Sequence, residues 1–70
     1  MKGTKELQEF LVAGLPNVNS RLSARLLEKF GSVRNVFCAS QDMLMKVDGI
    51  GKKKAEDIWC LLNGKYEGNG

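Results

Sequence analysis

The turn Gly49-Ile50-Gly51, followed by three consecutive lysines at 52–54, is the segment whose residue types are best suited to chemistry. Glycine adopts left-handed backbone conformations at little cost and keeps the backbone bare at the surface. A helix that begins after Gly51 would open with amides that have no intrahelical acceptor, and its dipole favours anions there. The lysines add charge at the same place, although at most two of them can face one anion. The segment therefore predicts an anion-binding turn.

Other interpretations of this turn stay open or are excluded by its context. A plain glycine turn between two packed helices, followed by solvated lysines, would have the same sequence. A phosphate-binding P-loop needs a longer loop and a preceding strand. A dinucleotide-binding turn needs a third glycine where Lys54 stands, again after a strand. No stretch of the sequence alternates with the period of a strand, which argues against both nucleotide sites.

A shift of 32 residues overlays the chain on itself and places a second turn, Asn17-Val18-Asn19, on the first. Periods of this size indicate duplicated supersecondary units. Asparagine tolerates left-handed conformations better than other non-glycine residues, so the turn can persist. Its side chains either crowd the backbone amides or bind an anion themselves. The next helix, which starts after Asn19 or Ser20, carries a basic stripe of Arg21, Arg25 and Lys29 that either binds anions or is merely solvated.

The elements that position these turns are expected to be five short helices and no strand. Thr4, Ser32 and Ser40 are the expected N-caps, Asn19 or Ser20 precedes the second helix, and Gly31 is expected to end it. The last helix is expected over about 52–62. Apolar residues at helical spacing predict the inward faces: Leu7, Phe10, Leu11, Leu22, Leu26, Leu27, Phe30, Val33, Val36, Phe37, Leu44, Val47, Ala55, Ile58, Trp59 and Leu62.

The composition excludes several classes of protein. The chain has 70 residues, which is one small domain, and it has no histidine. Cys38 and Cys60 cannot fill a zinc site alone, and they are expected to be reduced core thiols, with a disulfide as the alternative. We expect no catalytic residue, metal, cofactor or membrane segment. The net charge of +3 permits an anionic partner without requiring one.

The chain from about Phe10 to Tyr66 resembles the C-terminal tandem helix-hairpin-helix domain of the XPF/Hef family. These proteins are structure-specific endonucleases and related helicase-nucleases, and the archaeal members are the nearest. Three parts of the sequence carry the resemblance: residues 15–18 with 26–33, residues 36–40 with 44–47, and residues 49–55. The asparagines of the first turn depart from the family pattern, in which glycines are usual.

The resemblance implies an all-α tandem helix-hairpin-helix domain over residues 1–66, with hairpins at about 15–21 and 47–53 and a flexible tail at 67–70. It implies sequence-independent binding to the backbone phosphates of double-stranded, forked or junction DNA. The implied contacts are Gly49, Ile50, Gly51, Lys52 and Lys53 in the second hairpin and Asn17, Asn19, Ser20, Arg21 and Arg25 in the first, weaker one. Nuclease chemistry would lie in a separate upstream domain of a larger intracellular repair protein, in archaeal cytoplasm or a eukaryotic nucleus.

The resemblance also implies a homodimer or a dimer of paralogues. In the family an aromatic residue just past the last helix inserts into the partner, and Tyr66 occupies that place. Trp59 belongs either to the core or to this interface. The alternative function is a protein-interaction module that dimerises and binds little DNA of its own.

Overall fold

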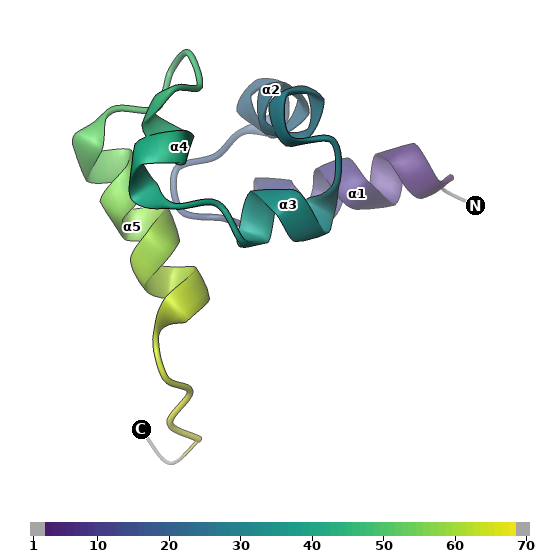
Figure 1. The fold of residues 1–70 in the computed structure, drawn as a ribbon. Helices are drawn as coiled ribbons and strands as arrows, with labels where there is room; N and C mark the ends of the chain where they lie inside the picture. Colours follow the sequence, from purple (N-terminus) through teal and green to yellow (C-terminus); the bar gives the residue numbers. More distant parts are fainter. Residues whose placement is uncertain (1–2, 69–70) are drawn as a thin grey trace.

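Five helices form the part of the chain that the computed structural model describes, residues 3–68, and this part contains no strand (Figure 1). The all-α expectation is therefore confirmed. The helices are α1 (Thr4–Ala13), α2 (Ser20–Phe30), α3 (Val33–Phe37), α4 (Gln41–Met45) and α5 (Lys52–Asn63). The first two helices pack together, the last two form a second pair, and α3 connects the pairs. None of the described helices is long and apolar enough to cross a membrane.

Local capping rules account for several of the helix ends. The Ser32 hydroxyl accepts a hydrogen bond from the Asn35 amide, and the Ser40 hydroxyl accepts one from the Met43 amide. Gly31 ends α2 in the left-handed region at φ 87°. These three predictions are confirmed. They matter for the site because the caps fix the short segments that connect the two helix pairs.

The N-cap predicted at Thr4 is wrong. Thr4 is already the first residue of α1, and Gly3 precedes the helix without a side-chain capping bond. Glycine ranks close to threonine as an N-cap residue, so the helix can begin one residue earlier at little cost.

One continuous hydrophobic core joins both helix pairs. It comprises Val12, Leu15, Val18, Leu22, Leu26, Val36, Leu44, Val47, Ile50, Ala55 and Ile58, all buried. The buried Ser23 contributes a small side chain whose hydroxyl donates to the Glu9 carbonyl oxygen at 2.7 Å, tying α2 to α1. Because apolar side chains from both pairs meet in this core, the pairs are packed as one body.

Two expected inward faces are more exposed than their spacing predicted. On α1, Leu7, Phe10 and Leu11 are exposed, Phe10 by 67 %, and Val12 is the residue that enters the core. Trp59 on α5 is also exposed rather than buried. Helical spacing shows that residues share a face but does not show that another element covers it.

The two cysteines lie on the surface of the domain. Cys38 and Cys60 are free thiols, but both are exposed, so their assignment to the core was wrong. Residues 69 and 70 of the expected tail lie outside the described residues.

Candidate functional site

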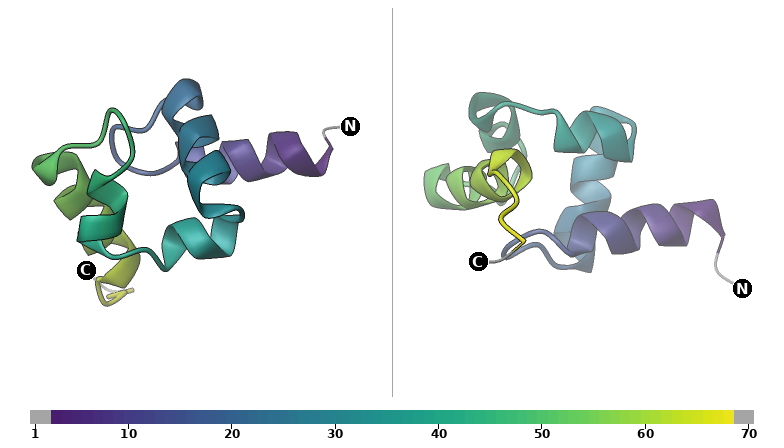
Figure 2. Two further views of the ribbon diagram at one scale, coloured as in Figure 1. Left: turned by 45° about the horizontal axis from the view of Figure 1, so that its top comes forward. Right: turned by 90° about the horizontal axis from the view of Figure 1, so that it is seen from below.

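The two turns have the same backbone path and lie on the same side of the molecule (Figure 2). Asn17 and Gly49 are both left-handed, with φ of 59° and 98°. Asn19 and Gly51 are both extended, with φ of −95° and −91°. The duplication inferred from the sequence is therefore also present in the geometry of the turns.

Each turn is pinned by a buried side chain. The Val18 amide donates to the Leu15 carbonyl oxygen at 3.2 Å, and the Ile50 amide donates to the Val47 carbonyl oxygen at 3.0 Å. All four side chains are buried in the core. The turns are thus held from inside, while the residues that flank Val18 and Ile50 face outward.

The helices that follow the turns differ at their first residues. The Asn19 side-chain oxygen accepts a hydrogen bond from the Leu22 amide at 2.9 Å and so caps α2. Gly51 provides no side-chain cap to α5, whose first regular bond runs from the Ala55 amide to the Gly51 carbonyl oxygen at 3.0 Å. The amides of residues 52–54 precede that bond and point out of the helix end. The second hairpin therefore offers a more open anion site than the first.

The glycine at position 51 is not required by the backbone. Its φ of −91° suits any residue, and a Cβ added there would have no atom within 4 Å. The expectation that both glycines of this turn provide left-handed conformations is correct for Gly49 and wrong for Gly51. A side chain at position 51 would therefore extend into open space.

The three lysines of α5 differ in their partners. Lys52 is exposed, whereas Lys53 donates to the Asp57 carboxylate at 3.1 Å. That hydrogen bond, with the Coulombic attraction of Asp57, raises the pKa of Lys53. Lys54 donates to the Gly49 carbonyl oxygen at 3.4 Å. Positive charge is therefore distributed around the helix end rather than aimed at one point.

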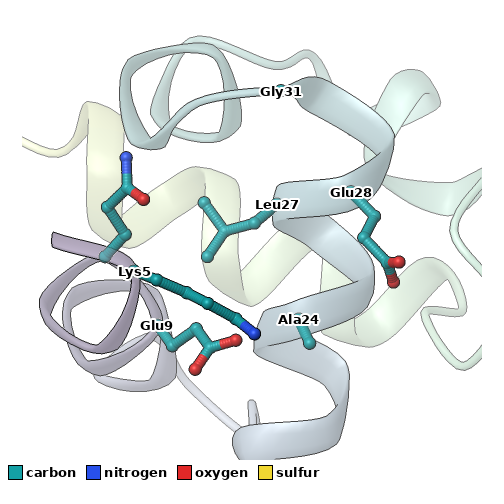
Figure 3. A pocket seen from close by; sticks show the side chains of 7 residues that line it. Lys5, Glu9, Ala24, Leu27, Glu28 and Gly31 are labelled. Carbon is teal, nitrogen blue, oxygen red and sulfur yellow. The ribbon is translucent and has the colours of Figure 1, made fainter. Parts of the chain in front are cut away.

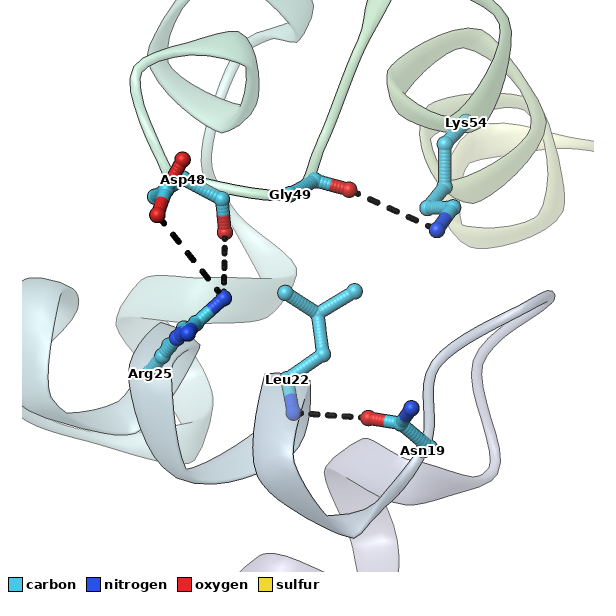
Figure 4. A network of polar contacts seen from close by, with 6 residues as sticks. All are labelled: Asn19, Leu22, Arg25, Asp48, Gly49 and Lys54. Atoms are coloured by element: carbon cyan, nitrogen blue, oxygen red, sulfur yellow. Dashed lines mark hydrogen bonds and ion pairs between the residues drawn. The ribbon is translucent and has the colours of Figure 1, made fainter.

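Arg25 of α2 lies next to the second hairpin (Figure 4). Arg25 Nη1 donates to the Asp48 carbonyl oxygen at 3.3 Å and lies 4.0 Å from the Asp48 carboxylate. Arg21 is exposed one turn earlier. A shallow hollow between the hairpins is lined by Asn19, Arg21, Leu22, Arg25, Gly49 and Lys54. The hollow thus gathers four of the predicted contact residues, Asn19, Arg21, Arg25 and Gly49, together with Lys54. The side chain of Ile50, another predicted contact, is buried in the core and is not available to a ligand.

A second hollow lies between α1 and α2, away from the turns (Figure 3). Lys5 and Glu9 of α1 face Ala24, Leu27 and Glu28 of α2 across it. Its lining mixes both charges with apolar surface, so it lacks the positive character of the hairpin surface.

The residues expected at a dimer interface lie on α5 and beyond it. Trp59 is partly exposed, and Tyr66 is 88 % exposed. Leu61 is a further exposed apolar residue on α5 that sequence reasoning missed.

Comparisons with known proteins agree with this geometry. The family model described as "SAM-like Helix-hairpin-helix tandem" matches residues 9–59. A Methanocaldococcus jannaschii protein named as an ATP-dependent RNA helicase is 48 % identical over 64 residues. The 3'-flap repair endonuclease Xpf of Saccharolobus solfataricus is 41 % identical over 66 residues. The structure of XPF from Aeropyrum pernix in complex with DNA superposes with a TM-score of 0.88 at 36 % identity.

These matches cover nearly all of this chain but only part of each relative. They include 91 %, 94 % and 94 % of the chain, against 8 % of the helicase, 28 % of the endonuclease and 33 % of the solved XPF chain. The family match, the all-helical fold and the two equivalent turns all indicate the same tandem hairpin architecture. The chain therefore belongs to the SAM-like tandem helix-hairpin-helix family and is similar within it to the archaeal XPF/Hef-type proteins.

Proposed function

We propose that this domain binds DNA through backbone phosphates and acts as the DNA-binding and dimerisation module of a branched-DNA repair nuclease or helicase. The observation that carries the proposal is the pair of matched hairpins on one basic surface, the second with an uncapped helix end. Its superposition on an XPF solved with DNA supports the same function. The catalytic chemistry of such a parent protein belongs to segments that its longer relatives have beyond this domain.

We propose that the DNA phosphates are contacted by unpaired backbone amides at the start of α5 and by nearby polar and basic side chains. A phosphate in front of Gly51 would accept hydrogen bonds from the first amides of α5, with Lys52 at its side. The first hairpin would contribute mainly through Ser20 and the exposed Arg21, because the Asn19 side chain already occupies one amide. Such contacts read the shape and spacing of phosphates and not the base sequence.

A salt-dependent titration tests this function. The purified domain is titrated with forked DNA, linear duplex and single strand of equal length. If about five phosphates are neutralised, the logarithm of affinity should fall against the logarithm of salt with a slope of about −4 to −5. Lys52→Gln should make that slope shallower by about one, whereas Lys5→Gln at the far end of α1 should leave it unchanged.

The main alternative is an interaction module with little DNA binding of its own. The exposed apolar side chains on α5 and after it favour a role in assembly, which we propose in addition to DNA binding. Replacing Lys52 and Lys53 by glutamate separates the two functions. Unchanged DNA affinity in the folded double variant would remove Lys52 and Lys53 from the DNA contact. A dimeric domain that binds no DNA at low salt would leave only the interaction role.

A further inference from the structure

The tip of the second hairpin is held from two sides by basic side chains (Figure 4). Arg25, from α2, donates to the Asp48 carbonyl oxygen, and Lys54, from α5, donates to the Gly49 carbonyl oxygen. Both carbonyls of this short segment are thereby bonded to cations of the domain itself. With the carbonyls fixed, the orientation of the peptide units at the tip is fixed as well.

The contact from α2 crosses between the two hairpin units. Arg25 follows the first hairpin, whereas Asp48 and Gly49 belong to the second. A Cβ on Gly49 would lie 3.4 Å from Arg25 Nη1 and 3.4 Å from Leu22 Cδ1, so the bare backbone of the tip already packs against α2. The Asp48 carboxylate adds little, since its side chain is 96 % exposed and 4.0 Å away.

We propose that Arg25 is a positioning residue, which fixes the tip of the second hairpin against α2 and so sets where its phosphate site stands relative to the first hairpin. This inference rests on the proposed DNA binding and refines it. The family resemblance implies a direct phosphate contact for both Arg25 and Arg21. The structure separates the two, because Arg25 bonds the neighbouring hairpin and Arg21 is exposed without such a bond among the described residues.

The test begins without DNA. Backbone ¹⁵N order parameters are measured for the amides of residues 48–51 in the wild type, Arg25→Gln, Arg25→Lys and Arg21→Gln. A rigid tip has order parameters near 0.85, and loss of the Arg25 bond should lower them toward about 0.6. Arg25→Lys should not restore the order, because lysine keeps the charge but lacks the planar, far-reaching guanidinium. Arg21→Gln is the matched control and should leave the tip rigid.

The second part measures duplex affinity over a range of salt. A mobile tip must be ordered on binding, and that cost does not depend on salt. Both Arg25 variants should therefore lose affinity by roughly fivefold at every salt concentration, with an unchanged slope. Arg21→Gln should instead make the slope shallower by about one. Asp48→Asn, which keeps the carbonyl, should leave the order parameters of residues 48–51 as in the wild type.

Two results would overturn the proposal. One is an unchanged order of residues 48–51 in both Arg25 variants. The other is recovery of full affinity by Arg25→Lys together with a shallower slope in Arg25→Gln, which would make Arg25 a direct phosphate contact. If the wild type binds no DNA, the proposed function fails, and the order parameters still decide whether Arg25 holds the tip.

Discussion

At the scale of single residues, the site depends on two positions that adopt the left-handed conformation. Asn17 and Gly49 occupy equivalent places in the two turns, at φ 59° and 98°. This conformation costs most L-residues about 1–2 kcal/mol, and asparagine and glycine are the residues that visit it routinely. The same backbone is therefore reached with two different residues, which explains why the first turn keeps its shape without glycines.

This equivalence predicts how the turns respond to alanine. Gly49→Ala should lower the free energy of unfolding by roughly 1 kcal/mol, because the left-handed conformation is unfavourable for alanine. For a domain of this size, that corresponds to a fall in Tm of about 4–8 °C. Asn17→Ala should behave alike, whereas Asn17→Gly should cause no loss. Thermal unfolding followed by circular dichroism measures all three, and an alanine variant as stable as wild type would show that the turn has another stable path.

At the scale of elements, the two hairpins differ in how their second helices begin. In the first, Asn19 caps α2, and in the second, Gly51 leaves α5 without a side-chain cap. A capping side chain stabilises the helix by typically about 1 kcal/mol but occupies the amides that an anion would use. Under the proposed DNA binding, the second hairpin therefore gives up the stability of a side-chain cap and leaves its amides accessible to a phosphate.

Exchanging the residue types at positions 19 and 51 tests whether a side-chain cap stabilises the helix and weakens DNA binding. Gly51→Asn should raise the Tm and weaken DNA binding, since the space at position 51 admits the side chain and its oxygen would cap α5. Asn19→Gly should lower stability by a few tenths of a kcal/mol and strengthen DNA binding. Unfolding curves and duplex titrations are recorded on the same samples. If Gly51→Asn stabilised the fold and bound DNA with full affinity, the free amides of α5 would not be the phosphate site.

The sequence predicts local features of single elements better than it predicts how the elements pack together. The bounds of α2, the caps at Ser32 and Ser40, and the end at Gly31 rest on local bonding, and they were predictable. The pinned turns were predictable from the repeat. The exposure of Phe10 and the bond from Arg25 to Asp48 were not, because both depend on how elements distant in sequence meet. Periodicity contains no information on which face remains uncovered.

At the scale of the whole molecule, one domain has a small candidate binding surface, and several of its large apolar side chains remain exposed to solvent. Tyr66 and Leu61 are exposed. The C-terminal end of α5 points away from the turn between α4 and α5 (Figure 1). A second copy that covered them would leave all hairpins accessible. Two linked domains would bind a branched DNA more tightly than one, because the second contact becomes intramolecular.

Tyr66→Ala tests both consequences. A central aromatic anchor of an interface typically contributes 2 kcal/mol or more, so the dimer dissociation constant should rise by about 30-fold, as measured by sedimentation velocity. Met43→Ala, at another exposed apolar residue, is the matched control and should leave self-association unchanged.

The DNA readout then separates assembly from direct contact. Affinity for a fork long enough for two domains should fall in Tyr66→Ala, while affinity for a short duplex that holds one domain should stay the same, because the hairpins are untouched. Equal losses on both DNAs would make Tyr66 a DNA contact. A sedimentation profile identical to that of the wild type would remove Tyr66 from the interface and leave Trp59 and Leu61 as the residues to test.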